Sequence, residues 1–509
     1  MISSASPRVL AMAATASAAS GLNVQLGATT AIFIECFNCT WPPCRLGQRA
    51  MTDQYFFCGI GGSGMLPLAA ILRAGGARVS GSDRSLDAGR LASKFEYLKS
   101  LGIGLSPQDG SGLAEGMTLV TSAAVEDTIP DVVRARELDL PHLTRPQLLA
   151  KLLNDAQTSV AVGGTSGKST VTGMIGWVLH AMHRQPTVMN GAVMKNFVAP
   201  QAPFASALVG DPELFVSEVD ESDGSISLYR PTVAVLGNIS LDHKEMDELR
   251  SLFAAFLARA QKAVVNLDDP ETRAIAEAIR DPIGYGFDTP GAALVGRNLE
   301  LRPDGASFTV DVGGDRHEVR LAVPGRHNAM NALAALGAIH ALGLPVGEAA
   351  VALARFEGLK RRLETVGTAG GVTVIDDFAH NPDKIAATLA TLTAQPGRLL
   401  IMFQPHGYGP IAKMGVELAG TFAEGMREGD RLFLPDAVYQ GGTVDKSRGS
   451  DWLAEAIRAA GGHAEHVPER AAIGRKLLAE ALPGDRIAIL GARDDTLSDF
   501  AAELVEKLG

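Results

Sequence analysis

The amino-acid sequence predicts an α/β protein built from three domains. The chain has 509 residues, a length that suits about three domains. Short apolar runs typical of strands alternate with stretches typical of helices, which indicates mainly parallel sheets. Two expected strands run into glycine-rich loops, at residues 59–64 and 163–167, and an expected helix follows each loop. We therefore expect a Rossmann-like domain at 51–152, a central P-loop domain at 153–355 and a C-terminal Rossmann-like, doubly wound domain at 356–509, after an N-terminal extension of residues 1–50.

Composition and charge exclude several classes of protein. Hydrophobic residues make up 46% of the chain and charged residues 20%, which is ordinary for a globular protein. The net charge of −11 argues against a nucleic-acid-binding surface. No apolar run reaches the roughly 20 residues that a membrane helix requires. No cysteine follows Cys58, so we expect no disulfide framework, and a reducing cytoplasm fits.

The first 50 residues are rich in Ala, Ser and Thr and show neither a helical nor a strand period. A signal peptide is one interpretation, because Arg8 precedes an Ala-rich stretch. The pair Cys36 and Cys39 could form half of a metal site, but no second pair or histidine cluster follows it. We expect instead that Met51 is the natural start or that residues 1–50 are a disordered extension.

The first glycine loop, Gly59-Ile-Gly-Gly-Ser-Gly64, predicts a nucleotide-binding βαβ unit. It follows an apolar strand, opens a helix expected at 65–74, and precedes a second strand that ends in Asp83. This spacing is typical of a dinucleotide fingerprint, in which glycines approach a phosphate and an acid binds ribose hydroxyls. Alone it suggests NAD, and more generally a nucleotide diphosphate. Thr121 and Ser122 lie at the end of a further expected strand. They are either ligand contacts or ordinary turn residues.

The second glycine loop, Val160-Ala-Val-Gly-Gly-Thr-Ser-Gly-Lys-Ser-Thr170, predicts a phosphate cradle. Its backbone N–H groups would meet an anion at a helix N-terminus, with the helix expected at 171–182. Lys168 would reach terminal phosphates, and Ser169 would ligate Mg²⁺. The common pattern places a glycine where Val162 stands. A glycine-rich turn before a buried helix is the alternative.

Polar side chains follow several later strands of the central domain. Glu218, Asp220, Glu221 and Asp223 end an apolar strand, and four carboxylates so close together favour Mg²⁺ over a solvated loop. Asn238 and His243 follow the next strand and suit a metal or phosphate edge, although a histidine taken alone is more often a surface or capping residue. His327 and Asn331 are four residues apart on one expected helix face, which could hold an adenine edge or simply cap the helix.

The C-terminal third repeats the alternation of strands and helices. In the stretch 371–383 we expect a strand, followed by Asp376, Asp377 and His380 and then by a helix. Further strands are expected at 398–403, 431–434 and 486–491, and an amphipathic helix at 497–508. This alternation predicts a second doubly wound sheet.

The order of these motifs resembles that of the Mur ligases, the ATP-dependent amide-forming family of peptidoglycan synthesis. Within that family the chain is most similar to the members that use UDP-N-acetylmuramate itself, and the resemblance covers nearly all of residues 51–509. The family P-loop has the shorter Gly-Thr-x-Gly-Lys form, which accounts for Val162. The matching stretches are 59–65, 79–83, 121–124, 164–170, 218–223, Asn238 with 242–243, 324–331, 361–362, 376–380 and 403–406.

The resemblance implies a set of site residues. Those implied for the UDP of the substrate are Gly61, Gly62, Ser63, Gly64, Ser82, Asp83 and Ser122. Those implied for ATP are Gly164, Thr165, Ser166, Gly167, Lys168, Ser169, Thr170, Asn238, His327, Asn331, Arg362 and Asp377. Ser169, Glu218 and His243 would bind Mg²⁺, and Lys168, Glu218, His243 and Arg362 would be catalytic. His380 and His406 would lie on the acceptor side.

The resemblance also implies a reaction. A UDP-N-acetylmuramate-type carboxylate would attack the γ-phosphate of ATP, and the amino group of an amino acid (L-alanine first) or of a peptide would displace phosphate from the acyl phosphate. The cofactors would be ATP and Mg²⁺, and the partners the UDP-sugar acid and the amine, without nucleic acid or membrane. A cytoplasmic monomer or homodimer is expected.

Some positions depart from the family pattern. The run Gly407-Tyr-Gly-Pro410 lacks the two arginines that follow Phe-Gln-Pro-His in alanine-adding members, so the acceptor stays open between alanine, another amino acid and a peptide. Ser166 stands where a histidine is usual, and Arg250 where several members carry a lysine that some carbamoylate. A ligase acting outside peptidoglycan, an NAD-dependent oxidoreductase and a non-catalytic paralogue are the other hypotheses.

Overall fold

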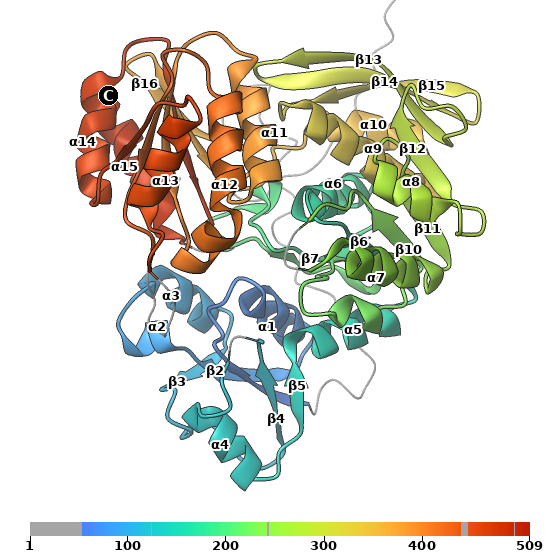
Figure 1. Ribbon diagram of the computed structural model, residues 1–509. Helices are drawn as coiled ribbons and strands as arrows, with labels where there is room; N and C mark the ends of the chain where they lie inside the picture. The colour runs from blue at the N-terminus through green and yellow to red at the C-terminus, as the bar shows by residue number, and fades with distance from the viewer. Residues whose placement is uncertain (1–52, 124, 242–243, 439–445, 493) are drawn as a thin grey trace, which may run out of the picture. The chain divides into compact units, whose positions relative to one another are not determined.

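A computed structural model describes residues 53–123, 125–241, 244–438, 446–492 and 494–509. Its strands form three sheets, of five, ten and six strands, in that order along the chain. The predicted α/β class with three sheets is confirmed (Figure 1). The domain boundaries stay predictions. The expectations for residues 1–50 and for His243 concern positions outside the described residues.

The N-terminal sheet is parallel throughout and has the order β3-β2-β1-β4-β5. The order reverses at β1, and in such sheets ligands bind beyond the carboxyl ends of the strands beside that point. The first glycine loop lies there, between β1 and α1. The elements are β1 (Gln54–Cys58), α1 (Met65–Ala74), β2 (Arg78–Ser82), α2 (Arg84–Asp87), α3 (Ala92–Ser100), β3 (Gly104–Ser106), β4 (Met117–Thr121), α4 (Pro130–Glu137), β5 (His142–Thr144) and α5 (Arg145–Asp155).

The central sheet has the order β15-β14-β13-β12-β11-β10-β6-β9-β7-β8. The P-loop strand β6 lies inside the sheet, between β10 and β9, and is buried on both faces. The strands are β6 (Thr158–Gly163), β7 (Pro186–Met189), β8 (Ala207–Leu208), β9 (Asp211–Glu218), β10 (Val233–Leu236), β11 (Lys262–Asn266), β12 (Ile283–Phe287), β13 (Leu294–Arg302), β14 (Gly305–Val312) and β15 (Asp315–Leu321). The helices are α6 (Lys168–Ala181), α7 (Met246–Ala258), α8 (Pro270–Ala276), α9 (Arg326–Ala341) and α10 (Val346–Leu353), with 3₁₀ turns at Lys195–Phe197 and Ser225–Leu228.

Helices cover both faces of this sheet, and alternate side chains of β6 pack against the helices on opposite faces. Val160 and Val162 share a hydrophobic core with residues of α6 and α9, whereas Ala161 belongs to the core that contains Phe253 and Phe256 of α7. Burial on both faces explains why Val160, Ala161 and Val162 of β6 are all apolar, rather than alternately apolar and polar. The helix α6 begins at Lys168, three residues earlier than expected, so the P-loop lysine belongs to its first turn.

Strands β13, β14 and β15 form an antiparallel extension that the sequence analysis did not anticipate. Two-residue turns join them, and the second turn consists of Gly313 and Gly314, whose φ angles are +60° and +96°. Positive φ at both central residues is the requirement of the tight hairpin turn that matches strand twist.

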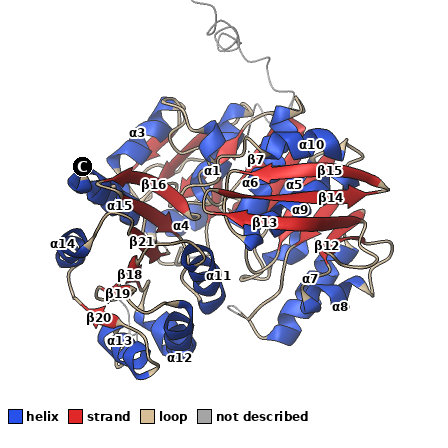
Figure 2. Ribbon diagram, turned by 90° about the horizontal axis from the view of Figure 1, so that it is seen from above, coloured by secondary structure: helices blue, strands red, loops and turns tan. Residues whose placement is uncertain are grey.

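The C-terminal sheet has the order β16-β17-β21-β18-β19-β20, with β16 antiparallel and the other pairs parallel. One hydrophobic core joins it to α11, α12 and α13 on one face and a second joins it to α14 and α15 on the other, so the predicted doubly wound sheet is confirmed (Figure 2). The elements are β16 (Glu364–Ala369), β17 (Val372–Asp377), α11 (Pro382–Thr393), β18 (Leu399–Gln404), α12 (Tyr408–Gly425), β19 (Arg431–Leu434), α13 (Ser450–Ala459), β20 (Ala464–His466), α14 (Arg470–Glu480), β21 (Arg486–Gly491) and α15 (Thr496–Leu508).

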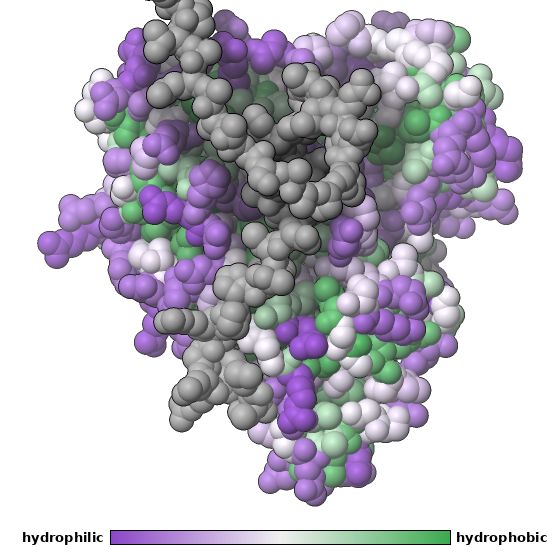
Figure 3. All heavy atoms as spheres, turned by 180° about the vertical axis from the view of Figure 1, so that it is seen from behind, coloured by the Kyte–Doolittle hydropathy of each residue, from purple (hydrophilic) through white to green (hydrophobic). Residues whose placement is uncertain are grey.

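Hydrophilic residues cover much of the face shown in Figure 3, with smaller hydrophobic patches between them. Among the described residues, no helix has both the length and the apolar composition needed to cross a membrane.

Candidate active site

The P-loop lines a cavity of about 500 Å³, which we call the P-loop pocket. Gly164 and Gly167 have φ angles of +127° and +83°, and Gly167 is the residue that precedes α6. A Cβ atom on Gly167 would lie 2.6 Å from Oδ1 of Asn331. The glycine is therefore required both by the backbone conformation and by the approach of α9.

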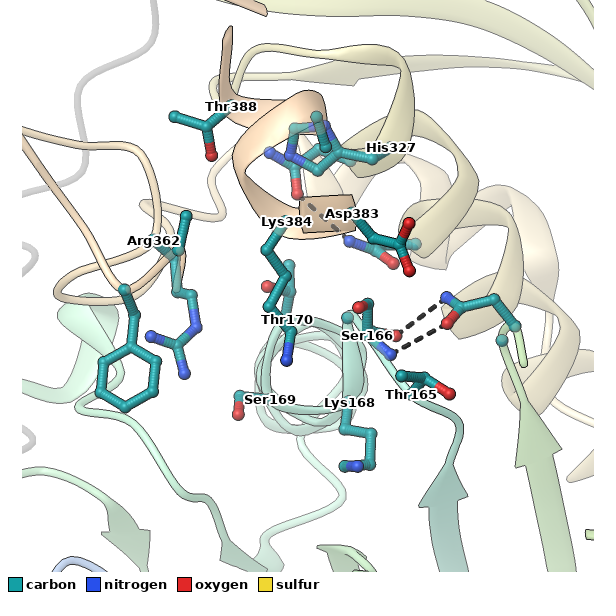
Figure 4. Close-up of a pocket in the computed structure, with 18 of the residues that line it drawn as sticks. Thr165, Ser166, Lys168, Ser169, Thr170, His327, Arg362, Asp383, Lys384 and Thr388 are labelled. Carbon is teal, nitrogen blue, oxygen red and sulfur yellow. Dashed lines mark hydrogen bonds between the residues drawn. The ribbon is translucent and has the colours of Figure 1, made fainter. Parts of the chain in front are cut away.

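Asn238 holds the loop in shape. Its side-chain Oδ1 accepts a hydrogen bond from the Ser166 N–H (2.9 Å), and its Nδ2 donates to the Ser166 carbonyl (3.0 Å) (Figure 4). The backbone carbonyl of Asn238 also accepts from the Thr165 N–H. The Ser166 hydroxyl is buried and has no hydrogen-bond partner among the described residues. An unsatisfied buried hydroxyl beside these amides suits a ligand with acceptor oxygens.

Two short contacts join the start of α6 to the acidic run after β9. Lys168 Nζ lies 2.6 Å from Oε2 of Glu221, and their side chains are 19% and 6% exposed. Ser169 Oγ donates to Oε2 of Glu218 over 2.6 Å. Glu218 reaches this position because it ends β9, where it pairs in register with Val162 of β6. Glu218 and Glu221 of the acidic run therefore contact the first two residues of α6.

Lys168 and the acidic residues that follow β9 shift one another's pKa values. Burial disfavours a charged Lys168, but the neighbouring carboxylates Glu221, Asp220 and Glu218 outweigh it and raise the pKa of Lys168. Burial likewise disfavours a charged Asp220, yet Lys168 and the hydrogen bonds from Ser222 lower its pKa. Lys168 is thus a cation over the physiological pH range, held among carboxylates.

The first turns of α9 supply another side of the P-loop pocket. His327 and Asn331 both line it, one turn apart on α9. Burial lowers the pKa of His327 to about 4, so this imidazole stays neutral at physiological pH. A neutral ring beside a carboxamide suits an uncharged ring system such as a nucleobase.

Residues of the C-terminal part of the chain, among them Arg362 and Asp377, line the same cavity. Arg362 lies over the ring of Phe378, with 4.4 Å between its guanidinium carbon and the ring centroid. Burial lowers the pKa of Arg362, an effect opposed by Asp377 and Glu218. The Asp377 carboxylate accepts hydrogen bonds from the N–H groups of Leu363 (2.6 Å) and Ala379 (2.8 Å). Asp377 therefore fixes the segment that carries Arg362.

The two histidines expected on the acceptor side lie together. The rings of His380 and His406 pack edge to face, with centroids 5.2 Å apart. His380 also lines the P-loop pocket, and its Nδ1 lies 2.9 Å from the carbonyl oxygen of Phe378.

The first glycine loop is ordered from within its own domain. Asp83 is buried, and its carboxylate accepts from the N–H groups of Gly61 (2.9 Å) and Ser85 (2.7 Å). The Ser82 hydroxyl donates to the buried carboxylate of Asp131. The roles of Gly61, Gly62, Ser63, Gly64, Ser82, Asp83 and Ser122 toward UDP stay predictions.

The models of the Mur ligase family catalytic domain, the Mur ligase middle domain and the Mur ligase glutamate ligase domain match residues 54–157, 162–339 and 361–493. A UDP-N-acetylmuramate–L-alanine ligase of Acidithiobacillus ferrooxidans is 34% identical, over 91% of this chain and 99% of the relative. One of Streptomyces coelicolor is 35% identical over the same shares.

The chain belongs to the Mur ligase family.

Solved structures of Mur ligases share this fold. The UDP-N-acetylmuramate–alanine ligase of Thermotoga maritima superposes with a TM-score of 0.73 at 25% identity, over 89% of this chain and 98% of that one. A murein peptide ligase of Psychrobacter arcticus gives 0.65 at 23% identity, over 90% and 99%, which shows the fold alone. The predicted family and the predicted class, an amide-forming ligase from an ATP-dependent family, are confirmed, and the oxidoreductase hypothesis is set aside.

The sequence analysis missed part of the P-loop pocket of this Mur ligase. Asp383, Lys384 and Thr388 of α11 also line it (Figure 4). A signal was present, because Asn381 and Pro382 are typical of a helix start directly after the predicted polar strand end. Arg250 lies elsewhere, at the surface of the Mur ligase, paired with Asp247 and Glu271.

Of the three predicted Mg²⁺ ligands, Ser169 and Glu218 lie among the described residues, where they are hydrogen-bonded to each other. The described residues contain no group of three or more His, Cys, Asp or Glu side chains that could hold a metal ion. The third predicted ligand, His243, lies outside them. Cys58 is buried, and burial raises the pKa of its thiol to about 12, which leaves it unsuited to metal binding.

Proposed function

We propose that this Mur ligase joins the carboxylate of UDP-N-acetylmuramate to the amino group of L-alanine, converting ATP to ADP and phosphate. The observation that carries the proposal is the P-loop pocket, in which Lys168 of the central domain lies in the same cavity as Arg362, more than 190 positions along the chain. The names of relatives that are 34% and 35% identical over 91% of the chain supply the substrates.

The pocket residues fit ATP and Mg²⁺. The unsatisfied Ser166 hydroxyl and the P-loop N–H groups that do not donate to Asn238 suit phosphate oxygens. Ser169 and Glu218 offer the oxygen ligands that Mg²⁺ prefers, and bound Mg²⁺ would neutralise charge that develops during phosphoryl transfer. The neutral His327 and Asn331 would face the adenine, and Arg362 would meet the phosphates from the C-terminal domain.

In the proposed reaction, different residues of this chain act on different steps. The substrate carboxylate attacks the γ-phosphate, ADP leaves, and the amine displaces phosphate from the resulting acyl phosphate. Lys168 and Arg362 stabilise negative charge on the transferred group from opposite domains. A pocket bounded by both domains keeps water from the acyl phosphate, which water would otherwise hydrolyse. His380 and His406 would lie where the amine enters.

Phosphate release tests the proposal. Wild-type protein with ATP, Mg²⁺, UDP-N-acetylmuramate and L-alanine should release phosphate only when all components are present. Lys168→Ala should lower the rate at least about 100-fold, because it removes a charge that stabilises the transition state. Lys151→Ala, an exposed lysine of α5 paired with Asp155, is the matched control and should match wild type.

A second acceptor should be tested in the same assay because the run Gly407-Tyr-Gly-Pro410 lacks the expected arginines. There is also open space beside Gly409, where a Cβ would meet nothing within 4 Å. Replacing alanine by a tripeptide that begins with alanine tests the peptide-adding alternative. Faster turnover with the tripeptide would reassign the acceptor, and no turnover with either amine would overturn the proposal. The cytoplasmic location and the oligomeric state stay predictions.

A further inference from the structure

Lys94 connects the first glycine loop to the C-terminal domain. Its Nζ lies 3.1 Å from the carbonyl oxygen of Gly61 and 3.1 Å from Oδ2 of Asp495. Lys94 belongs to α3 and its side chain is 11% exposed, whereas Asp495 directly precedes α15 and its side chain is 62% exposed. A nearly buried ammonium group therefore takes its counter-charge from a residue 401 positions further along the chain.

On the glycine-loop side, Lys94 completes a set of restraints on one peptide unit. The N–H of Gly61 donates to Asp83 and its carbonyl accepts from Lys94. A Cβ on Gly61 would lie 3.0 Å from Oδ2 of Asp83 and 3.2 Å from the ring of Phe95, the residue after Lys94. The position of Gly61 is thus set by α3 and by the end of β2 together.

On the C-terminal side, Asp495 contacts Arg361, the residue that precedes Arg362 of the P-loop pocket. Oδ1 of Asp495 lies 3.9 Å from Nη1 of Arg361. The same Nη1 donates to the carbonyl of Asp494 (3.0 Å), and Nη2 of Arg361 donates to the carbonyl of Gly491 (2.7 Å). The next residue, Arg362, lines the pocket and donates to the carbonyl of Arg361 (2.9 Å). A continuous path of contacts joins Gly61 to Arg362.

We propose that Lys94 and Asp495 are positioning residues that fix the first glycine loop relative to the arginine of the P-loop pocket. The inference rests on the proposed function, in which that loop holds the UDP end of the acid substrate. When the pair is formed, the acid is held against the transferred phosphate in the reactive geometry. When it is broken, each ligand binds but the reacting atoms are displaced, and such displacement costs rate.

Three variants test the pair: Lys94→Met, Asp495→Asn and the double variant. Each single variant should lower kcat about 10-fold. The Kd of a non-hydrolysable ATP analogue should change less than about 2-fold, because the pocket itself is intact. The double variant should be no slower than either single variant, since both remove one shared interaction. Lys94→Arg, which keeps the charge, should retain most of kcat.

Lys99→Met is the matched control, because Lys99 lies on the same helix and its ion-pair partner among the described residues is the exposed Glu96. It should match wild type. Independent effects that multiply to about 100-fold in the double variant, or single variants with wild-type kcat, would overturn the inference. Thermal melts identify a variant that does not fold, and Asp495→Asn, at an exposed position, then carries the test.

Failure of the proposed function is a separate result. A wild-type protein that releases no phosphate with UDP-N-acetylmuramate and either amine contradicts that function. The pair is then judged by small-angle X-ray scattering without substrates. An increased radius of gyration for Asp495→Asn, but not for Lys99→Met, would support the contact between domains, and equal radii would overturn it.

Discussion

At the scale of single residues, Lys168 is stabilised by the carboxylates around it. Glu221 contacts it directly, and Asp220 and Glu218 add to the negative field. Two charges held away from water are favourable only while both are present, and removing one leaves the other without compensation. The sequence showed the P-loop lysine and the acidic run as separate motifs, and the structure shows that they form one charge cluster.

The stability of two variants tests this cluster. Lys168→Ala should lower the free energy of unfolding by about 2 kcal/mol, because it leaves the buried Glu221 unpaired beside two other acids. Adding Glu221→Gln to that variant should recover about half of the loss. Thermal melts without ATP and Mg²⁺ measure both effects. A double variant less stable than Lys168→Ala would contradict the pairing.

At the scale of elements, the loop between β6 and α6 owes its shape to glycine. Strand and loop are specified by neighbouring residues, so the sequence predicted both, and it placed the helix start three residues too late. The hairpins β13–β15 were missed, although Gly313-Gly314 is a hairpin signal in sequence. The clamp that Asn238 places on Ser166 could not be predicted, because it depends on the pairing of β10 with β6.

Gly167→Ala tests the loop. Its left-handed backbone and the approach of Asn331 should lower the affinity for an ATP analogue at least about 10-fold, since an alanine there costs roughly 1–2 kcal/mol before any clash. Calorimetry with Mg²⁺ and the analogue measures this. Gly420→Ala, in the interior of α12 where a Cβ meets nothing within 4 Å, is the control and should leave affinity unchanged while raising Tm. Wild-type affinity in Gly167→Ala would contradict the proposed role.

At the scale of the whole molecule, the P-loop pocket is assembled from distant parts of the chain. Lys168, His327 and Arg362 line it together. The order of motifs was enough to predict the family and three sheets, but not the contacts of Lys94 or the packing of α11 over the pocket. Those depend on how the domains meet, which no local pattern encodes.

A ligand bound in this pocket should stabilise both domains that line it. A non-hydrolysable ATP analogue with Mg²⁺ at about 100 times its Kd should add about 2.7 kcal/mol to stability. Differential scanning calorimetry should show the transitions of the central and C-terminal domains moving upward together. In Arg362→Ala the C-terminal transition should move less than in wild type. A shift confined to the central domain in wild-type protein would argue that the C-terminal side does not bind the nucleotide.

The ion pair between Lys168 and Glu221 also bears on how the site empties. Under the proposed function, nucleotide phosphates would have to displace the Glu221 carboxylate from Lys168. The net affinity for nucleotide would then be weaker than the phosphate contacts alone would give. After the reaction the same carboxylate would return to Lys168 as phosphate departs, which would favour release of ADP.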